Sequence, residues 1–200
     1  MPLDHPSGSM KRGVSSPLAG GERERYTGVA IVLHWLVAVL ILGQIAFGWY
    51  LQTVPRKTPD RTIYVNLHKS TGLTLGLLVL VRLAWRLTHK APPLPDSIPA
   101  WQRTAARASH FALYACMLIM PAAGYVASNF SRFGVNFFNA ILLPPWGIDN
   151  PRIYGVFNSI HVVTSYVLVA LIVLHVLAAL RHLYLRDGVF LRMWRARAAP

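Results

Sequence analysis

Four histidines lie inside strongly apolar stretches of this sequence, at positions His34, His68, His161 and His175. An imidazole can bind a metal, form hydrogen bonds, or carry a proton near neutral pH. A polar ring inside a membrane helix is costly and by default marks a functional site. These four rings are therefore the first candidates for chemistry in the chain.

The spacing of the last two histidines places them on one helix face. His161 and His175 are 14 residues apart, which is close to four turns of an α-helix at about 3.6 residues per turn. At about 1.5 Å of rise per residue, the two positions are separated by about 21 Å along the helix axis. One helix could therefore contribute a ligand to each of two sites at different depths.

The elements that must position these rings are four long apolar segments. The chain has 200 residues, of which 54% are hydrophobic and only 14% are charged. Segments near 20 apolar residues can cross a hydrocarbon core of about 30 Å. They are Val29 to Leu51, Asn66 to Leu87, Ser109 to Ser128 and Asn158 to Leu183. We expect an all-α, integral membrane four-helix bundle over residues 26–195, a disordered cytoplasmic tail over 1–25, and a short C-terminal tail over 196–200.

The charge distribution predicts the orientation of these helices. The formal net charge is +13. Basic residues before the first segment, around the second connection and after the fourth segment number 14, against 6 in the other two connections. The positive-inside rule then places both termini in the cytoplasm. The basic excess follows from this topology and requires no nucleic-acid partner.

With this topology the four histidines form two pairs at matching depths. His34 and His175 lie near the inner face, and His68 and His161 near the outer face. Two imidazoles can fill both axial positions of a haem iron, and helix bundles commonly hold such cofactors. The pairs predict two b-type haems, since no CxxCH attachment motif is present. Zinc or copper is a weaker alternative, because neither pair has a cysteine or carboxylate to complete a site.

Small residues and one arginine near the pairs have two possible roles each. Gly72 and Gly76 follow His68 on its helix face, and Gly43 and Gly48 lie on the first segment. These glycines could admit a flat macrocycle, or they could serve ordinary close helix packing. Arg82 could pair with a haem propionate. It could equally anchor its helix at the inner face.

Several motifs resemble the prokaryotic di-haem cytochrome b561 family, within the wider group of hydrogenase-type cytochrome b subunits. They are LHWLVA around His34, LHKSTG around His68, LMPAAGY ending at Tyr125, and LHVLAALRHLYLRDGVFLRMW around His175. The resemblance covers about residues 26 to 195. One departure is Val162, where the family often has an acidic residue after the histidine.

The resemblance implies a four-helix bundle in the bacterial inner membrane that holds two b haems and exchanges electrons with ubiquinone. Some members of the family resemble superoxide oxidases, which take an electron from superoxide at the outer face. It also favours a quinone role for His182, on nearly the same helix face as His175, and for His110, expected at the start of the third helix. His182 could instead be an interface residue.

We therefore expect a membrane di-haem cytochrome that transfers electrons between an outer-face donor, such as superoxide, and ubiquinone. The alternative is a non-catalytic carrier or anchor subunit for a dehydrogenase or a periplasmic redox protein. A transporter is disfavoured, because no carboxylate lies in any of the four apolar segments.

Overall fold

The computed structural model describes residues 26–89, 91–95 and 98–194. Within these ranges the chain forms four long α-helices, one short β-hairpin and one 3-10 turn. The predicted tails over 1–25 and 196–200 lie outside the described residues. The expected all-α membrane bundle is confirmed, with the small hairpin as its one departure from helix among the regular elements described.

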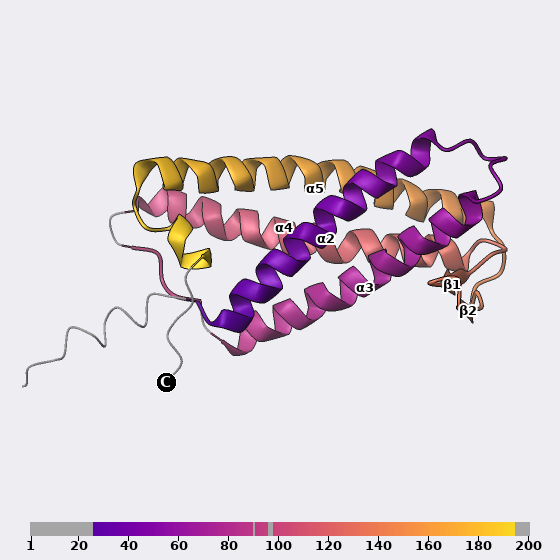
Figure 1. Ribbon diagram of the computed structural model, residues 1–200, viewed down its shortest axis with the longest axis horizontal. Coiled ribbons are helices and arrows are strands. Elements are labelled where there is room, and N and C mark those ends of the chain that lie inside the picture. The colour runs from indigo at the N-terminus through magenta and orange to yellow at the C-terminus, as the bar shows by residue number, and fades with distance from the viewer. Residues whose placement is uncertain (1–25, 90, 96–97, 195–200) are drawn as a thin grey trace, which may run out of the picture.

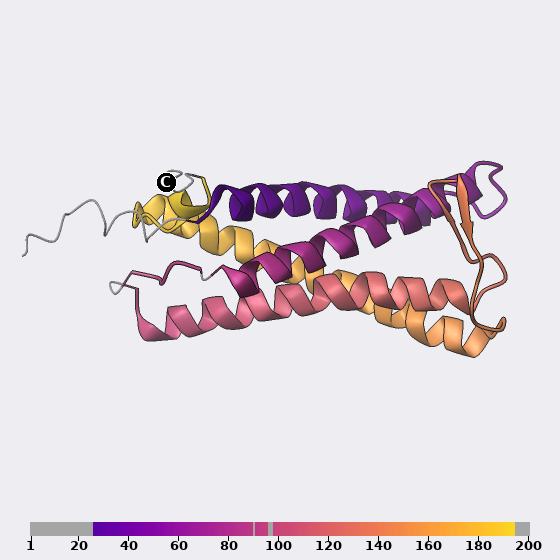
Figure 2. The same cartoon turned by 90° about the horizontal axis from the view of Figure 1, so that it is seen from below.

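The four helices run along the long axis of the molecule (Figures 1 and 2). Their bounds are α2 Gly28–Thr53, α3 Arg61–Thr88, α4 Ala100–Asn129 and α5 Pro151–Leu185. The start of α2 and the end of α5 lie at the same end of the bundle, which we call the terminal end. The opposite end carries β1 (Val135–Phe137) and β2 (Ile141–Leu143), and we call it the hairpin end.

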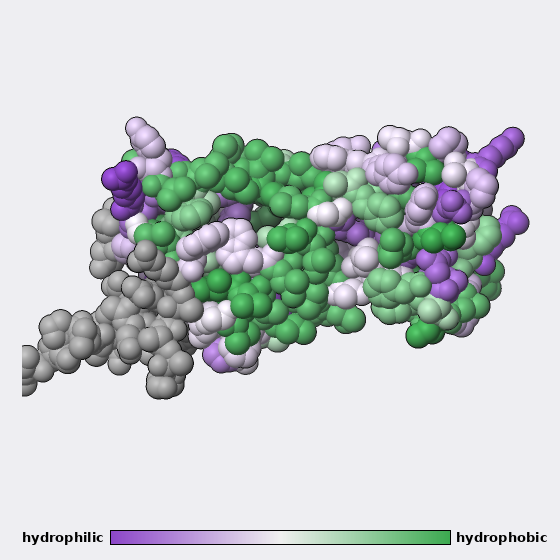
Figure 3. All heavy atoms as spheres, viewed as in Figure 1, coloured by the Kyte–Doolittle hydropathy of each residue, from purple (hydrophilic) through white to green (hydrophobic). Residues whose placement is uncertain are grey.

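All four helices are long and apolar enough to cross a membrane. Many large apolar side chains remain exposed along them, as a bundle surrounded by lipid requires. Figure 3 shows apolar residues covering much of one flank, with hydrophilic residues gathered mainly toward its two ends. This distribution is the one expected for a protein that spans a bilayer.

Three of the helices begin at least five residues before their apolar segments do. Helix α3 begins at Arg61 rather than Asn66, and α5 at Pro151 rather than Asn158. The largest difference is in α4, which begins at Ala100 rather than Ser109. Polar residues at the membrane boundary continue the helical hydrogen bonds, whereas hydropathy reports only the apolar part. His110 therefore lies inside α4, and the expectation that it starts this helix was wrong.

Local sequence explains where α2 and α5 start. The Thr27 hydroxyl accepts a hydrogen bond from the Ala30 amide at 3.3 Å and so caps α2. The Asn150 side chain accepts from the amides of Arg152 and Ile153, and Pro151 occupies the first turn of α5. A capping side chain satisfies amides that have no partner within the helix, and a proline in the first turn has no amide to satisfy.

The apolar core occupies the middle of the bundle. Its buried side chains come from all four helices and are Val37, Ile41, Leu75, Val79, Leu113, Met120 and Leu168. Leu168 is fully buried. It lies seven residues after His161 and seven before His175, so the core separates the two histidine positions of α5.

Short segments close each end of the bundle. At the hairpin end, β1 pairs antiparallel with β2 and packs against α3. At the terminal end, the 3-10 turn η1 (Phe190–Met193) returns toward α2. There the Trp35 indole donates to the Met193 carbonyl at 2.9 Å. The Trp35 ring also lies 5.4 Å from that of Trp194.

Candidate functional site

The structure brings the four membrane histidines together as the two expected pairs. At the terminal end, the ring centroids of His34 on α2 and His175 on α5 are 6.3 Å apart. At the hairpin end, those of His68 on α3 and His161 on α5 are 6.2 Å apart. Two imidazoles that bind one metal from opposite sides, through bonds of about 2 Å each, have centroids about 6 Å apart.

The paired histidines face each other across helices that are not closely packed. Helix α5 packs against α4, and α3 packs against α2 and α4. By contrast, α5 makes little backbone contact with α2 or α3, the two helices that carry its histidine partners. The rings of each pair therefore meet between helices whose backbones are held apart.

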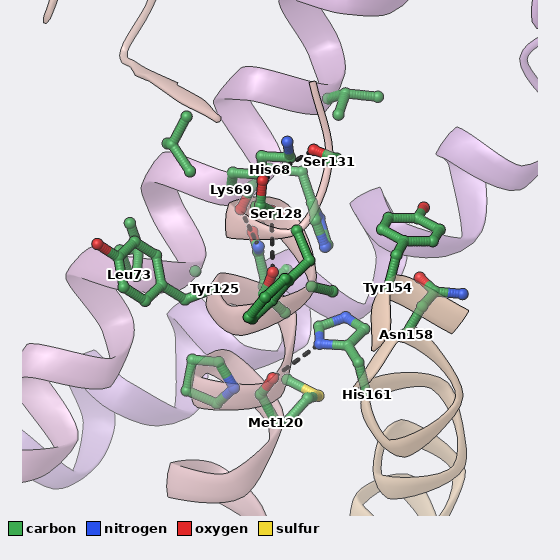
Figure 4. A pocket seen from close by; sticks show the side chains of 18 of the residues that line it. His68, Lys69, Leu73, Met120, Tyr125, Ser128, Ser131, Tyr154, Asn158 and His161 are labelled. Carbon is green, nitrogen blue, oxygen red and sulfur yellow. Dashed lines mark hydrogen bonds between the residues drawn. The ribbon is translucent and has the colours of Figure 1, made fainter. Parts of the chain in front are cut away.

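At the hairpin end there is a cavity of about 530 Å³. Its wall includes both His68 and His161 (Figure 4). It also includes the core residue Leu168. Most of the deeper lining is apolar, whereas Tyr154 and Asn158 add polar groups beside His161. The volume falls within the range of about 300–1,000 Å³ that is common for small-molecule and cofactor sites.

The ring of His161 is oriented by the backbone of α4. Its Nδ1 atom lies 2.8 Å from the Met120 carbonyl oxygen, as the dashed line in Figure 4 marks. A carbonyl can only accept, so Nδ1 carries the hydrogen and Nε2 keeps a free lone pair. Histidines that bind metals usually donate their other N–H to such a group. His161 is therefore held in the tautomer that a metal ligand needs.

Two of the other rings lack this support. The Nδ1 atoms of His34 and His68 are buried and have no hydrogen-bond partner. A buried polar atom without a partner costs free energy and calls for an explanation. A group that bound the opposite nitrogen of each ring would compensate for this cost.

Two glycines make room for the histidine rings at the hairpin end. A Cβ atom on Gly124 would lie 2.9 Å from His161 Nδ1, and one on Gly48 would lie 3.1 Å from His68 Cε1. Sequence reasoning missed Gly124, although the small residues after Pro121 were a signal for close approach. The structure gives the other glycines different surroundings. Gly72 and Gly76 pack against Gln44 and Pro121, and a Cβ on Gly43 would meet open space.

Gln44 ties α2 to α3 at the level of His68. Its amide nitrogen donates to the His68 carbonyl at 2.6 Å, and its amide oxygen accepts from the Thr71 hydroxyl at 2.7 Å. The side chain is buried. Polar bonds of this kind hold membrane helices together where lipid offers no alternative partner.

The hairpin is fastened to α3 on the turn that carries His68. The Lys69 ammonium donates to the Gly134 carbonyl, and the Ser70 hydroxyl accepts from the Phe138 amide, both at 2.8 Å. Ser70 is fully buried. These bonds hold the hairpin against one side of the hairpin-end cavity. They also fix the backbone next to His68.

The terminal end holds a third histidine. The ring of His110 on α4 lies 5.5 Å from that of His175. Arg82 of α3 interacts electrostatically with His34, His110 and His175. The guanidinium carbon of Arg82 is 5.6 Å from the centre of the Tyr114 ring. The predicted site residues His110 and Arg82 therefore lie close to the terminal-end pair.

His182 has an acidic partner that sequence reasoning did not identify. Its Nδ1 atom lies 2.5 Å from a carboxylate oxygen of Asp187, just past the end of α5. The other carboxylate oxygen accepts from the Val189 amide at 3.1 Å. Arg186 adopts a left-handed conformation (φ 52°) that turns the chain back after the helix. The RDG sequence at this turn was the available signal for the contact.

The donor set fits haem better than a simple metal ion. Among the described residues, no group of three or more His, Cys, Asp or Glu side chains is placed to hold a metal. Each end instead offers two facing imidazoles, and at the hairpin end these line an apolar cavity and are approached by glycines. Two axial nitrogens suffice for haem, because the macrocycle supplies the other iron ligands.

Comparison with known proteins agrees with this chemistry. The sequence pattern of the family described as prokaryotic cytochrome b561 matches residues 25–196. Cytochrome b561 homolog 2 of Escherichia coli K12 is 30% identical over 178 residues, which cover 85% of this chain and 91% of that protein. Cytochrome b562 of Cereibacter sphaeroides is 28% identical, covering 86% and 96% of the two chains. A probable superoxide oxidase of Yersinia pestis is 24% identical, covering 85% and 96%.

The family match extends over nearly the whole described chain, all four helices and all four paired histidines. The chain therefore belongs to the prokaryotic cytochrome b561 family, a family of bacterial membrane proteins that transfer electrons and whose membership implies b-type haem.

Proposed function

We propose that the protein is a di-haem cytochrome that carries electrons across the bacterial inner membrane, from a donor at the outer face to ubiquinone at the inner face. The observation that carries this proposal is the pair of facing imidazoles at each end of one bundle, with both ends sharing α5. Each bound haem would supply an iron that accepts and releases one electron without binding O₂.

The apolar core between the pairs supports transfer along the bundle. Leu168 lies midway between the two histidines of α5, and Val37, Ile41 and Val79 pack in the same layer of the molecule. These side chains exclude water and hold the two sites at a constant separation. The arrangement suits electron transfer between two fixed centres rather than passage of a solute.

The proposed orientation places the terminal end in the cytoplasm, because basic residues are concentrated there. Both α2 and α5 reach this end, which agrees with an even number of crossings. A reporter domain fused after Pro200 should be active only in the cytoplasm. Activity only in the periplasm would exchange the two faces and contradict the proposed direction.

The hairpin end has features that suit an anionic donor. Arg56 and Lys57 are exposed in the loop between α2 and α3, and Lys69 lies at the cavity wall. Positive charge around an opening raises the local concentration of anions. Two superoxide anions that each lost one electron here would become two O₂ molecules, and the two electrons would reduce one ubiquinone.

The terminal end has features that suit quinone reduction, which consumes two protons. The imidazole of His182 and the carboxylate of Asp187 are in contact, and both side chains are 18% exposed. Such a pair can take a proton from the inner aqueous phase and deliver it to a reduced quinone. His110 is the candidate for the second proton donor, since it also lies at this end.

Purified protein in nanodiscs tests the proposal and separates it from the carrier alternative. We expect two haems per chain by pyridine haemochrome, and ubiquinol formation when superoxide is generated in the presence of ubiquinone alone. A ratio of one haem per chain would contradict the two-site arrangement. Two haems with no ubiquinol until a dehydrogenase or periplasmic cytochrome is added would identify a carrier subunit instead.

A further inference from the structure

Arg82 is a mostly buried cation within a helix that spans the membrane. The carboxylates among the described residues are those of Asp60, Asp149 and Asp187. Two of these, Asp149 and Asp187, are paired with other side chains. Asp60 precedes α3 at the hairpin end, about 33 Å from Arg82 at about 1.5 Å of rise per residue. Within the described part of the chain, no acidic side chain therefore compensates the charge of Arg82.

The neighbour of Arg82 is Tyr114. The Tyr114 hydroxyl is buried and forms no well-aligned hydrogen bond, although the guanidinium lies beside its ring. Burial of an unsatisfied hydroxyl and of an uncompensated cation are both unfavourable. Both costs occur at one place, and a single anion that bound both groups would reduce them together.

The position of Arg82 and Tyr114 relative to the histidines indicates which anion they would bind. Tyr114 lies one helical turn after His110 on α4, and His110 is in ring contact with His175. Arg82 interacts electrostatically with both His34 and His175. The two unsatisfied groups therefore border the terminal-end histidine pair.

We propose that Arg82 and Tyr114 form a carboxylate-binding site, and that a propionate of the terminal-end haem is the carboxylate it takes. The inference rests on the proposed di-haem function and adds to it an anchor for one haem, formed by Arg82 and Tyr114. A guanidinium offers a planar fork of donors that matches a carboxylate, and a phenol adds one more donor. A phospholipid phosphate is the other anion with suitable chemistry at this depth.

The anchor also sets the reduction potential of the terminal-end haem. A cation beside the haem favours the reduced state, because that state carries one positive charge fewer at the iron. Loss of Arg82 should therefore lower the midpoint potential of this haem and leave the hairpin-end haem nearly unchanged. We expect a change of about tenfold in the ratio of oxidised to reduced haem, which is about 59 mV for a one-electron couple.

Potentiometric titration of the holoprotein tests this, with Arg82→Gln, Tyr114→Phe and the matched control Arg107→Gln. Arg107 is exposed on α4 at the same end, so its removal deletes an equal charge outside the site. We expect a full shift for Arg82→Gln, a smaller shift in the same direction for Tyr114→Phe, and none for Arg107→Gln. If Arg82→Gln fails to fold, Arg82→Lys replaces it in the test. This variant keeps the charge but not the planar fork of donors, so it should give an intermediate shift.

A second arm distinguishes the two anions. The protein is reconstituted with haem b or with its dimethyl ester, in nanodiscs of neutral or of anionic lipid. The proposal expects the wild type to release the ester from the terminal end faster than haem b, whereas Arg82→Gln should release both at the same rate, in both lipids. Equal release of haem b and the ester from the wild type, or an effect of Arg82→Gln that appears only in anionic lipid, would identify a lipid phosphate and overturn the assignment. A wild-type haem count below two contradicts the proposed function instead.

Discussion

The two ends of the bundle hold histidine pairs of nearly equal spacing, but they support those pairs differently. At the hairpin end, backbone and small residues hold the rings: the Met120 carbonyl binds His161, and Gly124 and Gly48 approach the two imidazoles. At the terminal end, the ionisable side chains of His110 and Arg82 lie near the rings, and the pair of His182 and Asp187 lies further along, at the end of α5.

The difference indicates separate tasks for two similar sites. A ring fixed by a backbone carbonyl changes its position little when the charge of a bound cofactor changes, which suits one-electron exchange. A site bordered by imidazoles, a carboxylate and a guanidinium can couple electron arrival to proton movement. Under the proposed function, the hairpin end accepts single electrons and the terminal end completes a reaction that needs protons.

Removal of a single histidine of either pair should have the largest effect. His161→Ala should abolish the hairpin-end haem and spare the other, so that the haem content falls from two per chain to one. His34→Ala should do the reverse, because each pair uses different helices for its second ring. Haem content and resolved redox spectra of both variants provide the measurement.

Equal loss of both haems in either variant would contradict the independence of the two ends. His89→Ala is the matched control. His89 is exposed and stacks on Trp85 at a centroid distance of 3.8 Å, outside both pairs. This change should leave both haems in place.

The proton-transfer pair of the terminal end should give the next largest effect. His182→Ala should slow ubiquinone reduction by a factor of about 10² to 10⁴, the usual contribution of general acid–base catalysis, with haem content unchanged. Asp187→Asn should give a smaller loss, since the amide oxygen can still accept from the Val189 amide. Stopped-flow oxidation of reduced haem by ubiquinone measures both variants.

An unchanged rate in His182→Ala would place the quinone elsewhere, with the mouth of the hairpin-end cavity near Lys69 as the next candidate. Loss of a haem in this variant would instead make His182 a structural residue. Either result would remove the functional contrast between the two ends.

The sequence predicted the bundle and the pairing of its histidines because both follow from periodicity and depth. Apolar length located four helices, and helical repeat placed His161 and His175 on one face. The contacts that distinguish the ends could not be predicted in the same way. The bond from His161 to Met120 joins α5 to α4, and the contact of His182 with Asp187 depends on a left-handed turn at Arg186.

Close approach of glycine to the rings was also beyond the sequence pattern. Four glycines were considered near the histidines, yet Gly72 and Gly76 face other helices, and Gly43 faces open space. The pattern did not point to Gly124, because it lies on α4, which carries no histidine of either pair. Periodicity shows which residues share a helix face, whereas contact between helices depends on how their axes cross.

A methyl group at Gly124 tests the backbone support of the hairpin end. Its Cβ would lie 2.9 Å from His161 Nδ1, so Gly124→Ala must displace the ring or the helix. Such overpacking typically costs about 1–3 kcal/mol, and we expect partial loss of the hairpin-end haem. Gly43→Ala is the control, because nothing lies within 4 Å of its Cβ. Equal haem retention in the two variants would argue against a tight fit at Gly124.

The smallest effect should come from the polar tie between α2 and α3. Gln44→Leu keeps the side-chain size but loses the bonds to the His68 carbonyl and the Thr71 hydroxyl. Hydrogen bonds between membrane helices contribute about 0.6 kcal/mol on average and at most about 1.7. We therefore expect slightly faster release of the hairpin-end haem on warming, with no change at the terminal end. Gln52→Leu, on an exposed position of the same helix, should change neither haem. If Gln44→Leu increased haem release equally at both ends, the hydrogen bonds of Gln44 would stabilise the whole bundle. They would then not be a separate support of the hairpin end.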